Sequence, residues 1–110
     1  MLMNVVMSTG TALAHRRAGN EAMAVSSERT SARASILVEA MWPRMPALRA
    51  SFEALSEAVA SEFLVEAPKQ PEPVEEWVAF LARWAYDMEQ LELISEALKA
   101  IEQRVQSDAD

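Results

Sequence analysis

The chain has no cysteine, a single histidine and only two glycines among its 110 residues. Without cysteine there is no disulfide, no thiolate zinc ligand and no thiol nucleophile. His15 has no second histidine with which to share a metal ion or a catalytic proton, and two isolated glycines do not build a phosphate-binding loop. These absences predict a protein that is not an enzyme and that uses no cofactor or metal.

Acidic residues offer one alternative to this interpretation. Glu89, Glu92 and Glu96 share one face of a predicted helix, so a carboxylate metal site is conceivable. Ferritin-like sites, however, pair such acids with a Glu-x-x-His motif, which this sequence does not contain. We interpret the three glutamates as a solvated acidic face.

Long apolar runs are also missing, and charge is distributed unevenly. No stretch approaches the roughly 18 uninterrupted apolar residues of a membrane span, which predicts a cytoplasmic protein without membrane contact. Residues 1–50 hold six arginines against three glutamates, whereas residues 51–110 hold four basic against fourteen acidic residues. An acidic body repels phosphate backbones, so we expect no direct nucleic-acid binding, with an arginine-bearing N-terminal arm as the weaker alternative.

Alanine, leucine, glutamate, arginine and methionine are abundant and lose little rotamer freedom in a helix, which predicts an all-α protein. Residues 1–26 lack a firm period and are expected to form a flexible or partly helical tail. A helical domain is predicted for residues 27–110, with helices over 27–42 and 46–65, a proline-rich loop over 67–73 and one long helix over 74–106. The apolar series continues across Pro43 and Pro46 in steps of three and four, so we expect an antiparallel hairpin with a kinked first arm.

Large apolar residues recur every seven positions in the long helix, as on the seam of a coiled coil. They are Trp77, Trp84, Leu91, Leu98 and Val105. The companion seam position fails at Ser95 and Glu102, so the apolar stripe migrates around the helix and needs long helical neighbours. We predict a core or self-association seam, in a dimeric bundle, formed by Leu48, Phe52, Leu55, Val59, Leu81, Met88, Leu91 and Leu98.

Val78, Tyr86 and Leu93 lie off this seam, and Trp77, Phe80 and Trp84 widen the apolar stripe at the same end of the helix, which suggests a second contact surface. The predicted protein-binding residues are Trp77, Phe80, Trp84, Tyr86 and Leu93. Aromatic anchors of this kind are enriched at interface hot spots. The alternative, which the sequence leaves open, is that the three residues Trp77, Phe80 and Trp84 fill the intramolecular core.

The tract EEWVAFLARWAY from Glu75 to Tyr86, with the preceding WPRMP from Trp42 to Pro46, resembles small bacterial quorum-sensing anti-activators of the QslA kind. The likeness covers roughly residues 28–106. It implies a helical, dimeric protein that binds the ligand-binding domain of a LuxR-type activator, so that the activator no longer dimerises or holds DNA. A small helical adaptor or secretion chaperone for another client protein is the alternative function.

Overall fold

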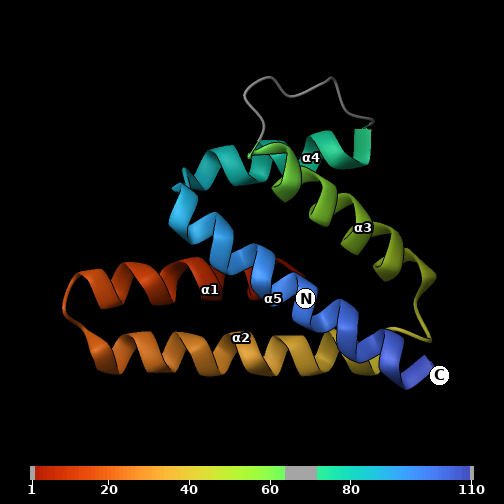
Figure 1. Ribbon diagram of the computed structural model, residues 1–110, viewed down its shortest axis with the longest axis horizontal. Coiled ribbons are helices and arrows are strands. Elements are labelled where there is room, and N and C mark those ends of the chain that lie inside the picture. Colours follow the sequence, from red (N-terminus) through yellow and green to blue (C-terminus); the bar gives the residue numbers. More distant parts are fainter. Residues whose placement is uncertain (1, 64–71, 110) are drawn as a thin grey trace.

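A computed structural model describes residues 2–63 and 72–109, which form five α-helices and no strand (Figure 1). The helices are α1 (Leu2–Arg17), α2 (Glu21–Met41), α3 (Pro46–Ser61), α4 (Glu72–Trp84) and α5 (Met88–Ala109). The all-α prediction is confirmed. The Cα atoms extend over 39 × 35 × 18 Å, so the molecule is about two helix diameters thick.

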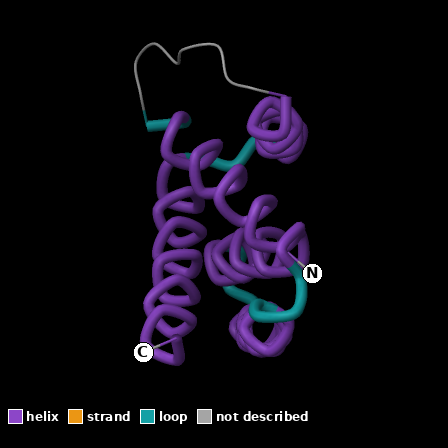
Figure 2. Tube along the Cα trace, turned by 90° about the vertical axis from the view of Figure 1, so that its right-hand side faces the viewer, coloured by secondary structure: helices purple, strands orange, loops and turns teal. Residues whose placement is uncertain are grey.

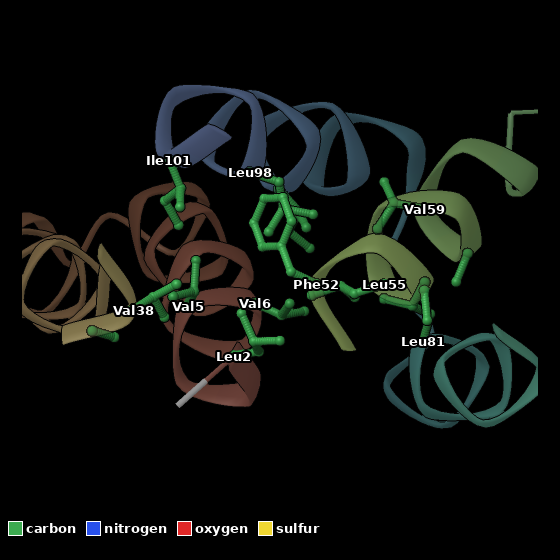
Figure 3. Close-up of a cluster of buried hydrophobic side chains, with 14 of the residues drawn as sticks. Leu2, Val5, Val6, Val38, Phe52, Leu55, Val59, Leu81, Leu98 and Ile101 are labelled. Carbon is green, nitrogen blue, oxygen red and sulfur yellow. The ribbon is translucent and has the colours of Figure 1, made fainter. Parts of the chain in front are cut away.

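Two helical pairs and one crossing helix make up the arrangement. The α1–α2 pair is antiparallel, α3 packs against α4, and α5 runs diagonally across the molecule in contact with α1, α2 and α3 (Figures 1 and 2). The core lies where these elements meet and takes side chains from all five helices (Figure 3). Its largest fully buried members are Leu55, Ile94, Ile101, Val5, Val6, Val38 and Val59.

The N-terminal segment is not a tail. Leu2, Val5 and Val6 of α1 are buried in the same core cluster as Ile94 and Ile101 of α5. The helical period is hard to see in the sequence because small residues occupy part of the inner face. The prediction of a tail over residues 1–26 is therefore corrected to a core helix and the first quarter of α2.

The α1–α2 connection has recognisable capping chemistry. Gly19 follows α1 with a φ of 78°, a left-handed conformation that glycine adopts without steric cost. Asn20 then caps α2, its side-chain oxygen accepting a hydrogen bond from the Met23 amide at 3.2 Å. As a result α2 begins at Glu21, six residues before the predicted start at residue 27.

The bend between α2 and α3 is sharper than a kink within one arm. Figure 1 shows α2 ending at one side of the molecule and α3 turning back from that end. Met45, with φ −129° and ψ 88°, leaves helical geometry immediately before Pro46, which occupies the first turn of α3. The predicted 46–65 helix ends at Ser61, and most of the predicted 67–73 loop lies outside the described residues, although α4 already includes its last two residues.

The long helix predicted over 74–106 is divided into α4 and α5. Ala85 has a φ of 50°, which interrupts the helical path. Asp87 then opens α5 with a capping box: its carboxylate accepts from the Gln90 amide at 2.9 Å, and the Gln90 side chain accepts from the Asp87 amide at 3.0 Å. The seven-residue repeat continues across a break at which the chain changes direction, so the apolar stripe serves two helices.

Candidate protein-docking surface

A surface groove runs between α3 and α5. It consists of two adjoining hollows of about 580 and 350 Å³, which share the lining residues Ser56, Ala60 and Glu102. One hollow begins at Trp42, at the end of α2, and the other extends to Phe63, just beyond α3. The small side chains of Ser56 and Ala60 leave this space open where larger residues would fill it.

The floor of the groove is apolar. Phe52 and Val105 line the first hollow and are only 2% and 6% exposed. Trp42 packs edge to face on Phe52, with ring centroids 5.1 Å apart and planes at 84°. Val59 and Leu98 continue the floor into the second hollow. The floor is thus set by rigid, packed side chains, which suits a preformed binding site.

Acidic side chains line the rim along the middle of the groove. Glu53 and Glu57, one helical turn apart on α3, are exposed and make no ion pair within the described part of the chain. Glu102 faces them from α5. Basic residues lie toward the two ends, where Arg49 donates to the Trp42 carbonyl at 3.3 Å and Lys99 lines the second hollow. An apolar floor between acidic walls fits an amphipathic helix that carries basic residues.

The five residues predicted from the sequence to bind protein lie outside the α3–α5 groove. Trp77 and Phe80 pack edge to face, with centroids 5.6 Å apart, and are half-buried against the core. Tyr86 and Leu93 are also half-buried. Of the five residues only Trp84 is mainly exposed, at 51%. None of the five lines the α3–α5 groove, and their role in docking stays a prediction.

The residues of the predicted seam lie mostly inside the molecule. Leu48, Phe52, Leu55, Val59, Leu81, Leu91 and Leu98 are buried within one chain. Met88 differs, because it is half exposed in the first turn of α5. The buried seam residues already have neighbours in the same molecule, so a self-association surface has to be sought elsewhere.

Tyr86 makes an unusually close approach to α1. A Cβ atom built on Gly10 would lie 2.5 Å from Cε1 of the Tyr86 ring, so only glycine fits at that position of the helix. Partial burial raises the pKa of the Tyr86 hydroxyl. The Gln90 side chain also donates to the Gly10 carbonyl at 3.0 Å. Through these contacts the start of α5 is fixed to the middle of α1.

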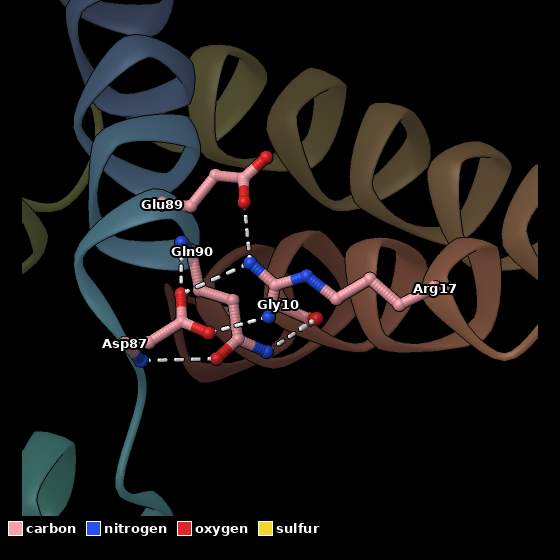
Figure 4. Close-up of polar contacts among 5 residues, drawn as sticks. All are labelled: Gly10, Arg17, Asp87, Glu89 and Gln90. Atoms are coloured by element: carbon pink, nitrogen blue, oxygen red, sulfur yellow. Dashed lines mark hydrogen bonds and ion pairs between the residues drawn. The ribbon is translucent and has the colours of Figure 1, made fainter.

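Arg17, in the last turn of α1, also ties the start of α5 to α1 (Figure 4). Its guanidinium pairs with the Asp87 carboxylate and donates to Glu89 at 2.6 Å. Hydrogen bonds from Arg17 and from the Gln90 amide hold the pKa of Asp87 below its usual value. The same carboxylates raise the pKa of Arg17.

The other polar residues considered from the sequence, His15 and the glutamates of α5, do not come together in one site among the described residues. Glu89 is engaged by Arg17, while Glu92 and Glu96 are exposed on α5. Over residues 2–63 and 72–109 no group of three or more histidine, aspartate or glutamate side chains is placed to hold a metal ion. His15 is half-buried in the last turn of α1. Within the same ranges no helix has the length and hydropathy needed to cross a membrane.

Sequence reasoning missed the rim of the groove. Glu53 and Glu57 on α3 and Glu102 on α5 belong to helices that the sequence predicts, but nothing in a single sequence says that these faces oppose each other. The available signal was local: Phe52 and Val59 flank Glu53 and Glu57, which are four residues apart, and the small residues Ser56 and Ala60 share this face of the helix. That pattern marks a helix with a shallow apolar strip and an acidic border.

The fold and the groove together define an all-helical domain of the bundle type with an acid-rimmed surface cleft. Its chain belongs to the family described as uncharacterised conserved protein UCP020893, whose model matches residues 1–101. The match includes α1 and α2, in agreement with their place in the core. Neither the curated proteins nor the solved structures contain a match to this chain.

Proposed function

We propose that the protein is a non-enzymatic interaction module that holds a cationic amphipathic helix of a partner protein in the α3–α5 groove. The observation that carries this proposal is the combination of an apolar floor at Phe52 and Val105 with acids at Glu53 and Glu57 that make no ion pair within residues 2–63 and 72–109. Helix-in-groove recognition needs an apolar strip for anchors at spacings of three and four residues, and charges at its border for orientation.

The dimensions of the groove agree with such a ligand. Its α3 wall runs from Arg49 to Ala60, twelve residues whose Cα atoms span about 17 Å of helix at 1.5 Å per residue. That length accommodates about three turns of a docked helix, enough for anchors at positions i, i+4 and i+7. The contact is small, so we expect an affinity set by a few apolar anchors and steered by charge.

For the partner we propose a LuxR-type transcriptional activator in the cytoplasm. The resemblance of the Glu75–Tyr86 tract to quorum-sensing anti-activators supports this choice, and the excess of acid over residues 51–110 favours binding to a basic surface of the activator. Occupying such a surface would block dimerisation of the activator or its contact with DNA. An adaptor or secretion chaperone would use the same groove without an effect on transcription.

The test is co-purification of the full chain with the ligand-binding domains of LuxR-type receptors, followed by titration calorimetry on any complex. Glu57→Arg places a like charge against a cationic helix and should weaken binding at least tenfold. Glu92→Arg, an equal change of net charge outside the groove, is the matched control and should bind like the wild type. A complex that both variants form equally well would rule out the groove.

The identity of the partner is tested separately. An activator bound through the groove should lose its operator DNA in a gel-shift assay when the protein is added, and Glu57→Arg should restore the shift. If no LuxR-type receptor of the source organism forms a complex, the activator proposal is wrong. A complex with another client and no effect on DNA binding would favour the adaptor or chaperone.

A homodimer is also part of the proposal. Since Leu91 and Leu98 are buried within the chain, the dimer would form through another surface. The exposed outer face of α2 is the surface with the clearest chemistry for one half of a contact between two copies.

A further inference from the structure

The outer face of α2 combines bare aliphatic surface with unpaired positive charge. Ile36 and Leu37 are 64% and 49% exposed, and Arg29 and Arg33 lie on the same side of the helix one and two turns earlier. Neither arginine makes an ion pair within residues 2–63 and 72–109, whereas Arg104 is paired with Glu39. This cationic face, defined here as Arg29, Arg33, Ile36 and Leu37, has no intramolecular cover.

Charge excludes the simplest occupant, which is the same face of a second copy. An isologous pair of α2 helices would place the arginines of one copy beside those of the other, with no exposed acid between residues 29 and 37 to separate them. Like charges at short range are unfavourable, and a few aliphatic contacts do not offset them. The occupant that fits must therefore be both apolar and acidic.

The α3–α5 groove of a second copy has this chemistry. Its floor at Phe52 is apolar, and Glu53 and Glu57 on its rim have no ion-pair partner in the described part of the chain. The cationic face extends from Arg29 to Leu37, nine residues that span about 12 Å of helix, and fits within the roughly 17 Å of the α3 wall. We propose that the cationic face of α2 in one molecule docks in the α3–α5 groove of another molecule of the same chain.

Such a contact joins two different surfaces, so it is heterologous: one molecule of the pair keeps a free groove and the other keeps a free cationic face. It also occupies the groove in which a target helix would bind, and α2 acts as a competitor for that helix. Self-association and target binding then exclude each other at one groove. The contact involves only surfaces of this chain, so it does not depend on the identity of any target.

The test uses two variants that each lose one half of the contact. R29E/R33E reverses the charge of the cationic face, and Ala60→Trp fills the groove where the two hollows join. By sedimentation equilibrium the wild-type mass should rise above 12.2 kDa with concentration and fall back with added salt, because salt screens exposed charges. Each variant alone should remain at 12.2 kDa.

Mixing the variants gives the decisive result. One intact groove and one intact cationic face remain in the mixture, so the mass should reach twice 12.2 kDa and stop there at any concentration. Arg83→Glu, an exposed charge reversal on α4, should associate like the wild type. Circular dichroism checks folding, and Leu37→Ser provides a milder change should R29E/R33E fail to fold.

Three outcomes would overturn the inference: a wild type that stays at 12.2 kDa at all concentrations, single variants that associate like the wild type, or a mixture that stays monomeric. The variants also separate this inference from the proposed function. Ala60→Trp should lose both self-association and target binding, whereas R29E/R33E should lose self-association and keep the target. Target binding without self-association, or the reverse, leaves one proposal standing and removes the other.

Discussion

Replacing Gly10 by alanine sets two effects of opposite sign against each other. In a helix interior alanine is favoured over glycine by about 1 kcal/mol, because it loses less backbone entropy on folding. At this position, however, the new Cβ would lie 2.5 Å from Cε1 of Tyr86 and 3.0 Å from its Cδ1. Carbon atoms prefer a separation of about 3.5–4.0 Å, so the ring or the helix must move.

The cost of that movement decides the result. Overpacking a well-packed site typically costs about 1–3 kcal/mol. The Tyr86 ring is partly buried and packs against the core cluster, which opposes its retreat from the new Cβ. We therefore expect Gly10→Ala to lower the free energy of unfolding by about 1 kcal/mol, the difference between the two effects.

A double-mutant cycle isolates the cause. In a Tyr86→Ala background the clash is absent, and Gly10→Ala should raise the free energy of unfolding by about 0.5–1 kcal/mol. Urea titrations followed by circular dichroism at 222 nm measure all four proteins. The same sign of the Gly10→Ala effect in both backgrounds would refute the reasoning. Gly19→Ala is the control, because its φ of 78° opposes alanine although no atom lies within 4 Å, so its cost should not depend on Tyr86.

Two further predictions concern the junction between α4 and α5. Asp87→Asn keeps the oxygen that caps α5 but removes the charge paired with Arg17. Folding lowers the pKa of Asp87 from 3.8. The ionised Asp87 therefore stabilises the fold above pH 3.8, and this contribution is lost as the pH falls through the pKa of the folded state. The difference in urea midpoint between wild type and Asp87→Asn at pH 7 should therefore vanish at the acid end of a pH series, and a difference that persists there would contradict the ion pair. Ala85→Gly should stabilise the protein by about 0.5–1 kcal/mol, because glycine adopts a positive φ without the steric cost that alanine bears, and a lower thermal midpoint for this variant would show that Ala85 is not strained.

The predictable part of the fold is the part in which sequence pattern and local chemistry agree. Pro46 in the first turn and apolar residues at steps of three and four fix the beginning and the buried face of α3. Composition alone predicts an all-α protein. The predicted boundary at Trp42 lies next to the observed end of α2 at Met41, but Trp42 keeps helical angles (φ −51°, ψ −50°), and the residue that leaves helical geometry before a proline is Met45.

Two predictions were wrong: the single long helix over residues 74–106 and the tail over residues 1–26. Across residues 74–106 the seven-residue repeat outweighed the capping box formed by Asp87 and Gln90, although both residues are legible in the sequence. In α1 the inner face includes Gly10, which is buried only because Tyr86 comes from 76 residues away to cover it. A contact of that kind has no trace in the local period of the helix.

The groove could not be predicted because it depends on that same long-range contact. Its α5 wall, with Glu102 and Val105, belongs to a helix whose start is held against α1 by Tyr86 and by the Arg17 ion pairs. The residues first interpreted as a tail thus orient one wall of the candidate docking surface. The family match covers residues 1–101 and so includes this helix as well as the predicted helical domain from residue 27. A domain without α1 would expose Ile94 and Ile101, and the direction of α5 across α3 would no longer be fixed.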